Sequence, residues 1–213
     1  MNFKAFIFDL DGVIVDTAKY HYLAWRRLAE ELGFEFTEEH NERLKGVSRV
    51  RSLEILLEIG NKTLTKEEMT SYATKKNEWY VDYIIKMTPE EILPGAIELL
   101  KYLKENGLGV ALASASKNAP LILERLNITE YFDAIVDGNR VSKTKPDPEV
   151  FLKAAKELNA SISECIVFED AVAGVEAAKN AEMYCVGIGN KTVLNKADMV
   201  IDGLHAFQLD MLK

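Results

Sequence analysis

The sequence is poor in cysteine, proline and glycine, and each scarcity excludes a class of protein. Two cysteines among 213 residues cannot build the disulfide framework of a small secreted domain. Five prolines and twelve glycines are too few for a disordered or fibrous chain. Cys165 and Cys185 lie in apolar runs without a metal-binding or redox spacing. We interpret them as buried thiols in a reducing compartment, and a disulfide between neighbouring strands is the alternative.

Long apolar runs and an excess of positive charge are also missing. No run approaches the roughly 18 apolar residues of a membrane-spanning helix, and the N-terminus lacks the features of a signal peptide. The 26 basic and 34 acidic residues give a net charge of −8, which argues against a dedicated nucleic-acid binder. We therefore expect a cytoplasmic protein without nucleic-acid or membrane partners, and we expect a monomer. A phosphorylated ligand would need a local basic pocket or a metal.

Three common functional motifs are absent as well. The segment GIGNKT at 187–192 lacks the G-x-x-x-x-G-K-[ST] spacing of a phosphate-binding loop, so a turn after a strand is the better interpretation. Neither G-x-S-x-G nor H-E-x-x-H occurs, which removes the commonest serine hydrolase and zinc protease signatures. The basic segment KGVSRVR at 45–51 is too short and too isolated to bind nucleic acid.

Short apolar runs alternate with helical patterns from about residue 94 onward. The runs are nearly continuously apolar, which is typical of parallel strands buried on both faces of a sheet. Helix-start and helix-stop residues flank helical patterns at 95–105 and 149–158. This alternation predicts an α/β fold with a doubly wound parallel sheet. After a first run at 3–8, the expected strands cover 109–114, 132–136, 164–170, 183–189 and 197–202.

The segment between the first strand and the rest is different. It shows four helical patterns and no convincing strand, so we predict an all-helical insert. The expected division is an α/β core domain from residues 1–16 and 92–213, and a helical cap domain from residues 17–91. The helical patterns cover 18–32, 38–44, 49–59 and 66–86.

Acidic side chains stand where several of the predicted strands end. In an open parallel sheet, ligands bind at the carboxyl ends of the strands. Four carboxylates gathered there would repel one another and raise one another's pKa unless a cation joined them. Mg²⁺ is the expected cation, because it prefers oxygen ligands. The alternative for any single acid is that it caps the helix that follows. The residues expected to converge are Asp9, Asp11, Glu169 and Asp170, together with Ser114 and Lys145.

Four segments that carry these residues resemble the four motifs of the haloacid dehalogenase (HAD) superfamily, in the usual order. They are DLDGVIVDT from Asp9, SAS from Ser114, KPDP from Lys145 and FEDAVAG, which contains Glu169 and Asp170. The resemblance covers nearly the whole chain and implies a HAD-like, Rossmann-type core with the helical insert as its cap.

The resemblance also implies roles for these residues. Asp9 would attack phosphorus and form an aspartyl-phosphate. Asp11 would act as general acid and base, while its backbone carbonyl helps to hold Mg²⁺. Side chains two residues apart on a strand share a face, so both carboxylates can reach one phosphoryl group. Glu169 and Asp170 would complete the metal site, and Lys145 and Ser114 would neutralise charge on the transferring oxygens.

Within the superfamily, four further segments resemble the β-phosphoglucomutases. This resemblance implies an isomerase that interconverts β-D-glucose 1-phosphate and β-D-glucose 6-phosphate, through an aspartyl-phosphate and bound β-glucose 1,6-bisphosphate. The alternative is a sugar-phosphate phosphatase of the same fold. A non-catalytic sensor is disfavoured because Asp9 is present, and a dehalogenase because Asp11 and Lys145 fit phosphoryl chemistry. The segments are HYLAW (21–25), LKGVSR (44–49), KKNEWY (75–80) and ALASASKNAP (111–120).

A mutase must protect its phospho-aspartate from water while the sugar turns round. The resemblance assigns control of Asp11 to Thr17, His21 and Lys76. Thr17 and His21 are four residues apart and share a face if a helix begins at Thr17. From periodicity alone, His21 is typical of a packed core residue and Lys76 of a solvated one.

The second phosphate of the sugar needs its own site. Arg49 is suited to multi-donor phosphate recognition, and 116–118 stand where a helix N-terminus offers backbone N–H groups. The alternatives are a solvated helix start for Arg49 and helix caps for Ser116 and Asn118. Trp25 is interpreted either as cap core or as a wall of the pocket. The residues expected to contact the sugar phosphate are Trp25, Lys45, Gly46, Val47, Arg49, Lys76, Ala115, Ser116, Lys117 and Asn118.

Overall fold

A single parallel sheet forms the centre of the molecule. The computed structural model describes residues 3–44 and 47–212. The strands of the sheet follow the order β3-β2-β1-β4-β5-β6, and every neighbouring pair is parallel. The predicted doubly wound α/β sheet is thereby confirmed. The strands are β1 (Ala5–Phe8), β2 (Gly109–Ala113), β3 (Ala134–Val136), β4 (Cys165–Glu169), β5 (Tyr184–Ile188) and β6 (Met199–Ile201).

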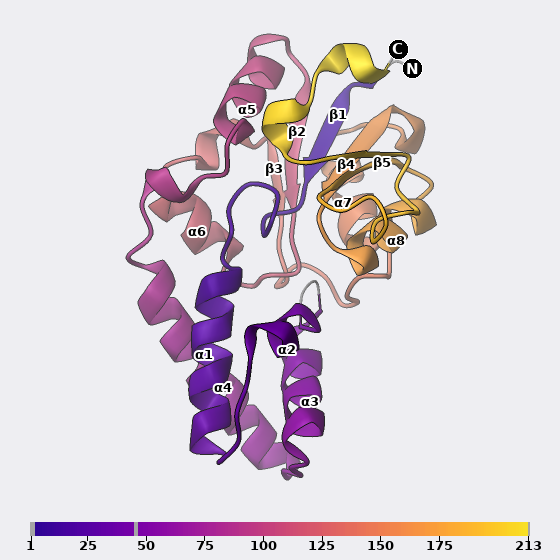
Figure 1. Cartoon of the computed structure of the whole chain (residues 1–213). Coiled ribbons are helices and arrows are strands. Elements are labelled where there is room, and N and C mark those ends of the chain that lie inside the picture. Colours follow the sequence, from indigo (N-terminus) through magenta and orange to yellow (C-terminus); the bar gives the residue numbers. More distant parts are fainter. Residues whose placement is uncertain (1–2, 45–46, 213) are drawn as a thin grey trace.

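Helices cover both faces of this sheet (Figure 1). Successive side chains of a strand point to opposite faces, so β1 contributes to two cores. Phe6 and Phe8 pack in the core that includes α5 and α6, whereas Ala5 and Ile7 pack in the core that includes α7 and α8. A sheet buried on both faces explains why its strands read as continuous apolar runs. The covering helices are α5 (Ala96–Glu105), α6 (Ala119–Arg125), α7 (Glu149–Glu157) and α8 (Val172–Asn180).

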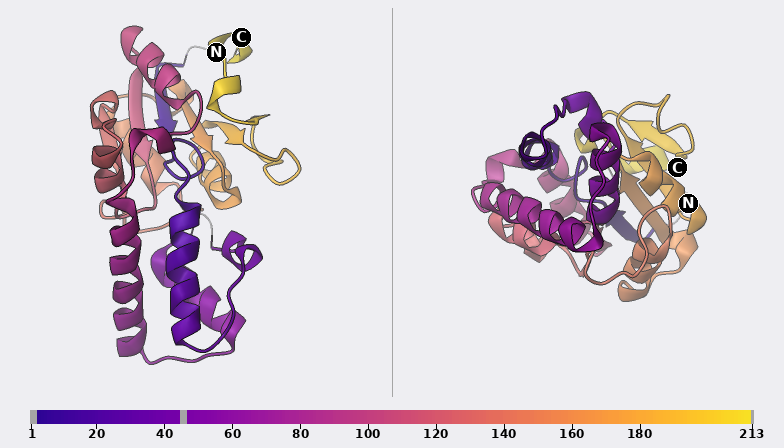
Figure 2. Two further views of the ribbon diagram at one scale, coloured as in Figure 1. Left: turned by 60° about the vertical axis from the view of Figure 1, so that its left-hand side comes forward. Right: turned by 90° about the horizontal axis from the view of Figure 1, so that it is seen from below.

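Four further helices gather beyond the carboxyl ends of the strands (Figure 1), and Figure 2 shows α1 and α4 running side by side. The chain enters and leaves this helical part at one place, where Val15 bridges Ile92 and the Leu93 N–H donates to the Ile14 carbonyl at 2.9 Å. This arrangement agrees with the expected insert, and the division into cap 17–91 and core stays a prediction. The helices are α1 (Ala18–Glu31), α2 (Glu38–Glu42), α3 (Arg49–Gly60) and α4 (Lys66–Ile84).

Element ends differ from the predicted ones by one or two residues. The predicted 66–86 helix ends at Ile84, because the N–H groups of Lys86 and Met87 bond to carbonyls three residues back and tighten the last turn ahead of Pro89. The predicted 38–44 helix likewise ends at Glu42. Short 3₁₀ helices complete the described chain at Pro89–Glu91, Thr129–Tyr131, Ile162–Glu164, Leu204–Ala206 and Leu209–Leu212.

The two cysteines lie on neighbouring strands, β4 and β5, and both are buried as free thiols. The buried-thiol interpretation is confirmed, and the disulfide alternative is wrong. Within 3–44 and 47–212, no helix combines the length and the apolar character that crossing a bilayer would require. The monomeric state and the cytoplasmic location stay predictions.

Candidate active site

The candidate site lies where the strand order reverses. β1 pairs with β2 on one side and with β4 on the other, and such a switch point leaves a crevice at the carboxyl ends of the strands. A cavity of about 1070 Å³ opens there. Asp9, Ser114 and Lys145 line it from the sheet side, while Arg49 and Lys76 line it from the helical side. Asp9 and Lys145, which are 136 positions apart in sequence, thus line the same cavity, as the strand pattern predicts.

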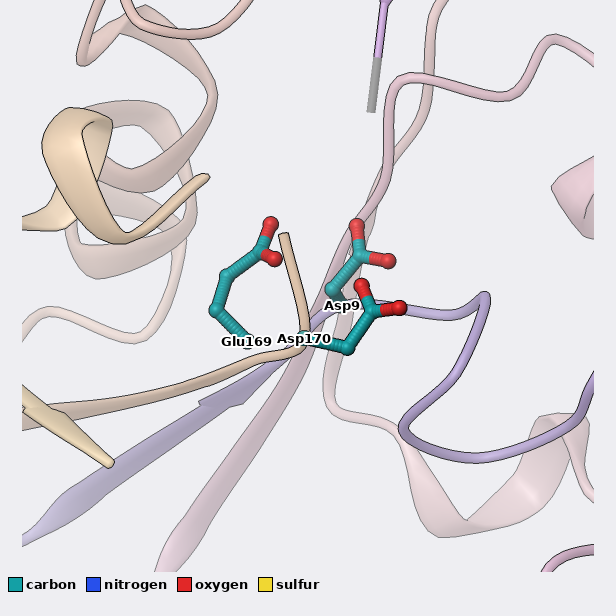
Figure 3. A group of neighbouring side chains, drawn as sticks. All are labelled: Asp9, Glu169 and Asp170. Carbon is teal, nitrogen blue, oxygen red and sulfur yellow. The ribbon is translucent and has the colours of Figure 1, made fainter. Parts of the chain in front are cut away.

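Three carboxylates form an acidic cluster at this edge (Figure 3). Asp9, Glu169 and Asp170 each contribute an oxygen, and these oxygens lie within 4.8 Å of one another. Burial, and then the charges of Glu169 and Asp9, raise the pKa of Asp170 to about 8. Burial and the charge of Asp9 also raise the pKa of Glu169. Hard oxygen ligands crowded in this way fit Mg²⁺, which would relieve their repulsion.

Asp11 does not join this cluster with its side chain. Its carboxylate accepts a hydrogen bond from the hydroxyl of Thr17 at the start of α1. The expected contribution of Asp11 to the metal site is through its backbone carbonyl, and that contribution stays a prediction. Burial, followed by the charge of Asp9, raises the pKa of Asp11 to about 7. A carboxyl group with such a pKa is suited to both donating and accepting a proton.

Two glycines leave room for the acidic cluster. A Cβ at Gly12, whose φ is +74°, would lie 2.1 Å from Oδ2 of Asp170. A Cβ at Gly174 in α8 would lie 1.9 Å from the carboxyl carbon of Glu169. Both distances are far below van der Waals contact, so any larger residue would displace a carboxylate. The glycines of the DLDG and FEDAVAG segments therefore serve the geometry of the cluster.

Lys145 supplies the counter-charge. Its Nζ donates to Oδ1 of Asp9 at 2.6 Å, to the carboxylate of Glu169, and to the carbonyl of Ala113 at 3.3 Å. Burial disfavours the charged form of Lys145, but the carboxylates of Asp9 and Glu169 outweigh it and raise the pKa of Lys145 above its ordinary value. Lys145 is thus a fixed cation beside the predicted nucleophile.

Glu149 fixes the loop that carries Lys145. Its carboxylate accepts hydrogen bonds from the N–H and hydroxyl of Ser142 at 2.9 and 3.0 Å, and from the Lys143 N–H at 2.7 Å. Lys153, one turn further along α7, donates to the same carboxylate at 2.6 Å. Asp147, just before α7, accepts from the Glu149 N–H at 3.0 Å. The first turn of α7 therefore anchors the loop on both sides of Lys145.

The three predicted gate residues meet on the helical side of the cavity. Nζ of Lys76 lies 2.9 Å from Nδ1 of His21, and the ring of His21 stacks on Tyr80 with centroids 4.1 Å apart. Tyr80 also donates to the Thr17 hydroxyl at 3.2 Å. Thr17 and His21 share a helix face, as their spacing predicts, since the His21 N–H bonds to the Thr17 carbonyl.

Lys76 is buried, so its interpretation from periodicity as a solvated residue is wrong. Only 2% of the residue is exposed, and its Nζ lies 4.3 Å from the Trp25 ring centroid. Burial and nearby Arg49 lower the pKa of Lys76 well below its ordinary value, and burial with Lys76 and Arg49 does the same to the pKa of His21. A negatively charged ligand in the cavity would relieve this crowding of cations.

The loop after β2 faces these cations. The Ser114 hydroxyl accepts from the Ser116 N–H at 3.1 Å, and the Ser116 hydroxyl accepts from the Asn118 N–H at 3.2 Å. Asn118 does not cap α6 with its side chain, because its amide donates to Asn77 of α4 at 3.0 Å. This hydrogen bond joins the sheet side and the helical side across the predicted phosphate site.

The remaining predicted contact residues are placed as follows. Trp25 is both buried in the core of the helical part and part of the cavity lining, so the two interpretations of it coexist. Arg49 is half-buried at the first turn of α3 and faces the cavity, rather than standing solvated. Val47, Ala115 and Lys117 also line the cavity. Lys45 and Gly46 fall outside the described residues.

Three further residues belong to this site, and their role is not evident from the sequence. Tyr80 contacts the gate residues. It belongs to the KKNEWY segment, whose pattern there is typical of a buried helix residue. Asn77 in the same segment contacts Asn118. Asn41 of α2 lines the cavity, is 6% exposed, and has no hydrogen-bond partner for Oδ1 among the described residues. No local sequence pattern marks it.

Comparisons with known proteins agree with this geometry. The sequence model of the haloacid dehalogenase-like hydrolase family matches residues 3–182. The β-phosphoglucomutase of Bacillus subtilis is 46% identical over 211 residues, which cover 98% of this chain and 93% of that protein. A phosphorylated carbohydrates phosphatase of Thermotoga maritima is 35% identical over 180 residues, covering 84% and 81% of the two chains.

A solved structure shares the whole arrangement. The crystal structure of β-phosphoglucomutase from Clostridium difficile superposes with a TM-score of 0.94 at 45% sequence identity. The match covers 99% of this chain and 95% of the other. The fold and the placement of the helical part relative to the sheet are therefore common to both proteins.

Gly174→Ala is expected to weaken Mg²⁺ binding without loosening the fold. Alanine favours a helix over glycine by roughly 0.5–1 kcal/mol, but its Cβ would push the Glu169 carboxylate out of the cluster. We expect the Mg²⁺ dissociation constant, measured by calorimetry, to rise about tenfold or more. Gly109→Ala in β2 is the control, since a Cβ there would meet Leu158 and the Lys4 carbonyl at 3.5 Å, an ordinary van der Waals distance. Unchanged affinity in Gly174→Ala would contradict the packing argument.

Glu149→Gln is expected to remove a pH-dependent part of the stability. Hydrogen bonds from Lys153 and then from the Lys143 N–H lower the pKa of Glu149 from 4.5 to about 2. A lowered pKa stabilises the fold above about pH 4.5, and this stabilisation is lost as the pH falls toward 2. The unfolding midpoints of wild type and variant should differ at neutral pH and converge in that range. A difference that stays constant from neutral pH to pH 2 would show that the carboxylate charge is not the cause.

Proposed function

The chain belongs to the haloacid dehalogenase-like hydrolase family, and on that premise we propose that it is a Mg²⁺-dependent β-phosphoglucomutase. It would interconvert β-D-glucose 1-phosphate and β-D-glucose 6-phosphate. The activity is an isomerisation by phosphoryl transfer through an aspartyl-phosphate, with β-glucose 1,6-bisphosphate as activator and bound intermediate. The 46% identity with a β-phosphoglucomutase over 98% of the chain supports this proposal.

The first step would transfer one phosphate of bound β-glucose 1,6-bisphosphate to Asp9, which forms the aspartyl-phosphate and leaves β-glucose 6-phosphate. An oxygen of Asp9 attacks phosphorus, and the bond between phosphorus and the sugar oxygen breaks. Asp11 gives its proton to that sugar oxygen, which leaves as a hydroxyl group. Lys145 holds Asp9 in place through the 2.6 Å contact and adds positive charge beside the reaction. Bound Mg²⁺, held by Asp9, Glu169 and Asp170, would supply positive charge for the transferring oxygens.

In the second step, the free hydroxyl of a β-glucose 1-phosphate attacks phosphorus while Asp11 takes its proton, and the bond to Asp9 breaks, which restores the bisphosphate. The bisphosphate must then turn within the cavity of about 1070 Å³ before its other phosphate can react with Asp9. Arg49, Ser116, Lys117 and Asn118 are proposed to hold the phosphate that does not react.

One observation carries the proposal. The carboxylate of Asp11 is held by Thr17, the residue before the first helix of the helical part, and not by the acidic cluster that it adjoins. A phosphatase needs only a positioned acid and base. A mutase must also withhold that group from water while the sugar exchanges ends. We propose that Thr17, His21 and Lys76 meet this second requirement by controlling the position of Asp11.

Phosphorus NMR of the protein with β-glucose 1-phosphate, Mg²⁺ and a trace of β-glucose 1,6-bisphosphate tests the function. We expect β-glucose 6-phosphate to appear with little inorganic phosphate. Asp9→Asn is expected to abolish turnover and to keep its melting temperature near that of wild type, because the amide has nearly the same shape, lessens the repulsion among the three carboxylates and leaves Lys145 paired with Glu169. Stoichiometric phosphate release without isomerisation would identify a phosphatase instead, and appreciable turnover by Asp9→Asn would exclude Asp9 as nucleophile.

Arg49→Ala is expected to raise KM for β-glucose 1-phosphate. The loss of a charged, multi-donor phosphate contact corresponds to about tenfold or more. Arg51→Ala is the matched control on the same helix, since Arg51 is exposed and pairs with Glu54 and Glu58. Steady-state kinetics of both variants should show the increase for Arg49→Ala alone. Equal values of KM for Arg49→Ala and wild type would rule out a substrate contact.

A further inference from the structure

Tyr80 occupies the point at which all three predicted gate residues meet. Its hydroxyl donates to Thr17 Oγ1 at 3.2 Å, and its ring lies 4.1 Å from the ring of His21 between centroids. Nζ of Lys76 lies 4.9 Å from the centroid of the same ring. Tyr80 itself is 1% exposed and Thr17 is 0% exposed, so water does not reach the hydrogen bond between them.

We propose that the hydroxyl of Tyr80 is a positioning group for Asp11, and that it acts through the hydroxyl of Thr17. Tyr80 donates to Thr17, and Thr17 donates to the Asp11 carboxylate. The proposal rests on the proposed function, because it names a residue that keeps the acid and base of that reaction in place. Tyr80 does not itself touch the reacting atoms.

The direction of these hydrogen bonds gives Tyr80 its effect. The Thr17 hydroxyl has one proton, which it gives to Asp11, and its oxygen then needs a donor. In a buried site that donor is Tyr80, and consecutive hydrogen bonds of this kind strengthen one another. Burial, and then the charge of Asp11, raise the pKa of Tyr80 above its ordinary value, so the phenol keeps its proton. Without the phenol, the Thr17 hydroxyl loses the contact that fixes its orientation.

The position also couples α4 to Asp11. Tyr80 lies on α4, at the far end of the helical part in sequence, whereas Thr17 is the residue before α1. Lys76 precedes Tyr80 by one helical turn on the same face. A shift of α4 relative to α1 would therefore change the contact with His21 and the contact with Thr17 together.

Tyr80→Phe removes the hydroxyl and keeps the ring that packs against His21 and Lys76. Tyr83→Phe is the matched control, because Tyr83 is a half-buried tyrosine of the same helix that stacks on Tyr20 and not on the gate residues. A double-mutant cycle with Thr17→Val tests whether Tyr80 acts through Thr17, and Thr17→Ser restores the hydroxyl. For each variant, isomerisation of β-glucose 1-phosphate, release of inorganic phosphate and melting temperature are measured.

We expect Tyr80→Phe to lower kcat about tenfold, to change KM less than twofold, and to raise the fraction of phosphate lost to water, as a misplaced acid and base would. In the Thr17→Val background, Tyr80→Phe should alter kcat less than twofold. In the Thr17→Ser background, Tyr80→Phe should still lower kcat about tenfold. Tyr83→Phe should behave as wild type.

Wild-type kcat and phosphate loss in Tyr80→Phe would overturn the proposal. So would an equal loss of kcat in the wild-type and Thr17→Val backgrounds, which would mean that Tyr80 acts by packing and not through Thr17. If wild type releases phosphate and does not isomerise, the proposed function fails. The same cycle, measured on phosphate release from β-glucose 6-phosphate, then still decides the role of Tyr80.

Discussion

The hydrogen-bonded ion pair between Lys145 and Asp9 is the interaction on which the site depends. As the proposed nucleophile, Asp9 must be charged, yet it is buried beside Glu169 and Asp170, which oppose that charge. Lys145 offsets this repulsion by bonding to both Asp9 and Glu169. Removing Lys145 would leave both carboxylates buried without their cation, at a cost of about 3–5 kcal/mol, so the lysine must be held firmly. Glu149 does this from α7 by tying down the loop that leads to Lys145. The strands, the loop and the helix thus serve a single electrostatic requirement.

The helical side of the cavity carries basic side chains, in contrast to the acidic cluster on the sheet side. Burial, and then the nearby positive charges, lower the pKa of His21 and the pKa of Lys76, and Arg49 contributes to both shifts. On the proposed function, the acidic cluster with bound Mg²⁺ on one wall and the basic side chains on the other would suit a ligand with two phosphates. One phosphate would meet the metal and Lys145, and the other would neutralise the cations. Binding of such a ligand would therefore favour a close approach of the two parts of the molecule.

Sequence patterns predict the sheet side of this site better than the helical side. Strand ends are visible as breaks in apolar runs, and the sheet brings the residues at those breaks together by its regular geometry. Asp9, Ser114 and Asp170 follow from that rule. Lys76 does not, because its burial depends on Trp25 and His21 of another helix, and the periodicity of α4 alone places it in solvent. Tyr80 is missed for the same reason, because its importance lies in contacts with Thr17 and His21, which the sequence of α4 alone does not reveal.

The topology explains why the helical part can control Asp11 at all. Asp11 lies in the short connection between β1 and α1, and its partner Thr17 begins the helical part. The returning chain passes the same point, where Val15 bridges Ile92. Any motion of the helices relative to the sheet must therefore change the backbone of these two connecting segments, within a few residues of Asp11. Asp9 stands two residues earlier, at the end of β1, where Lys145 bonds to it. The proposed nucleophile is thus tied to the sheet side of the cavity, whereas the proposed acid and base is tied through Thr17 to the helical part.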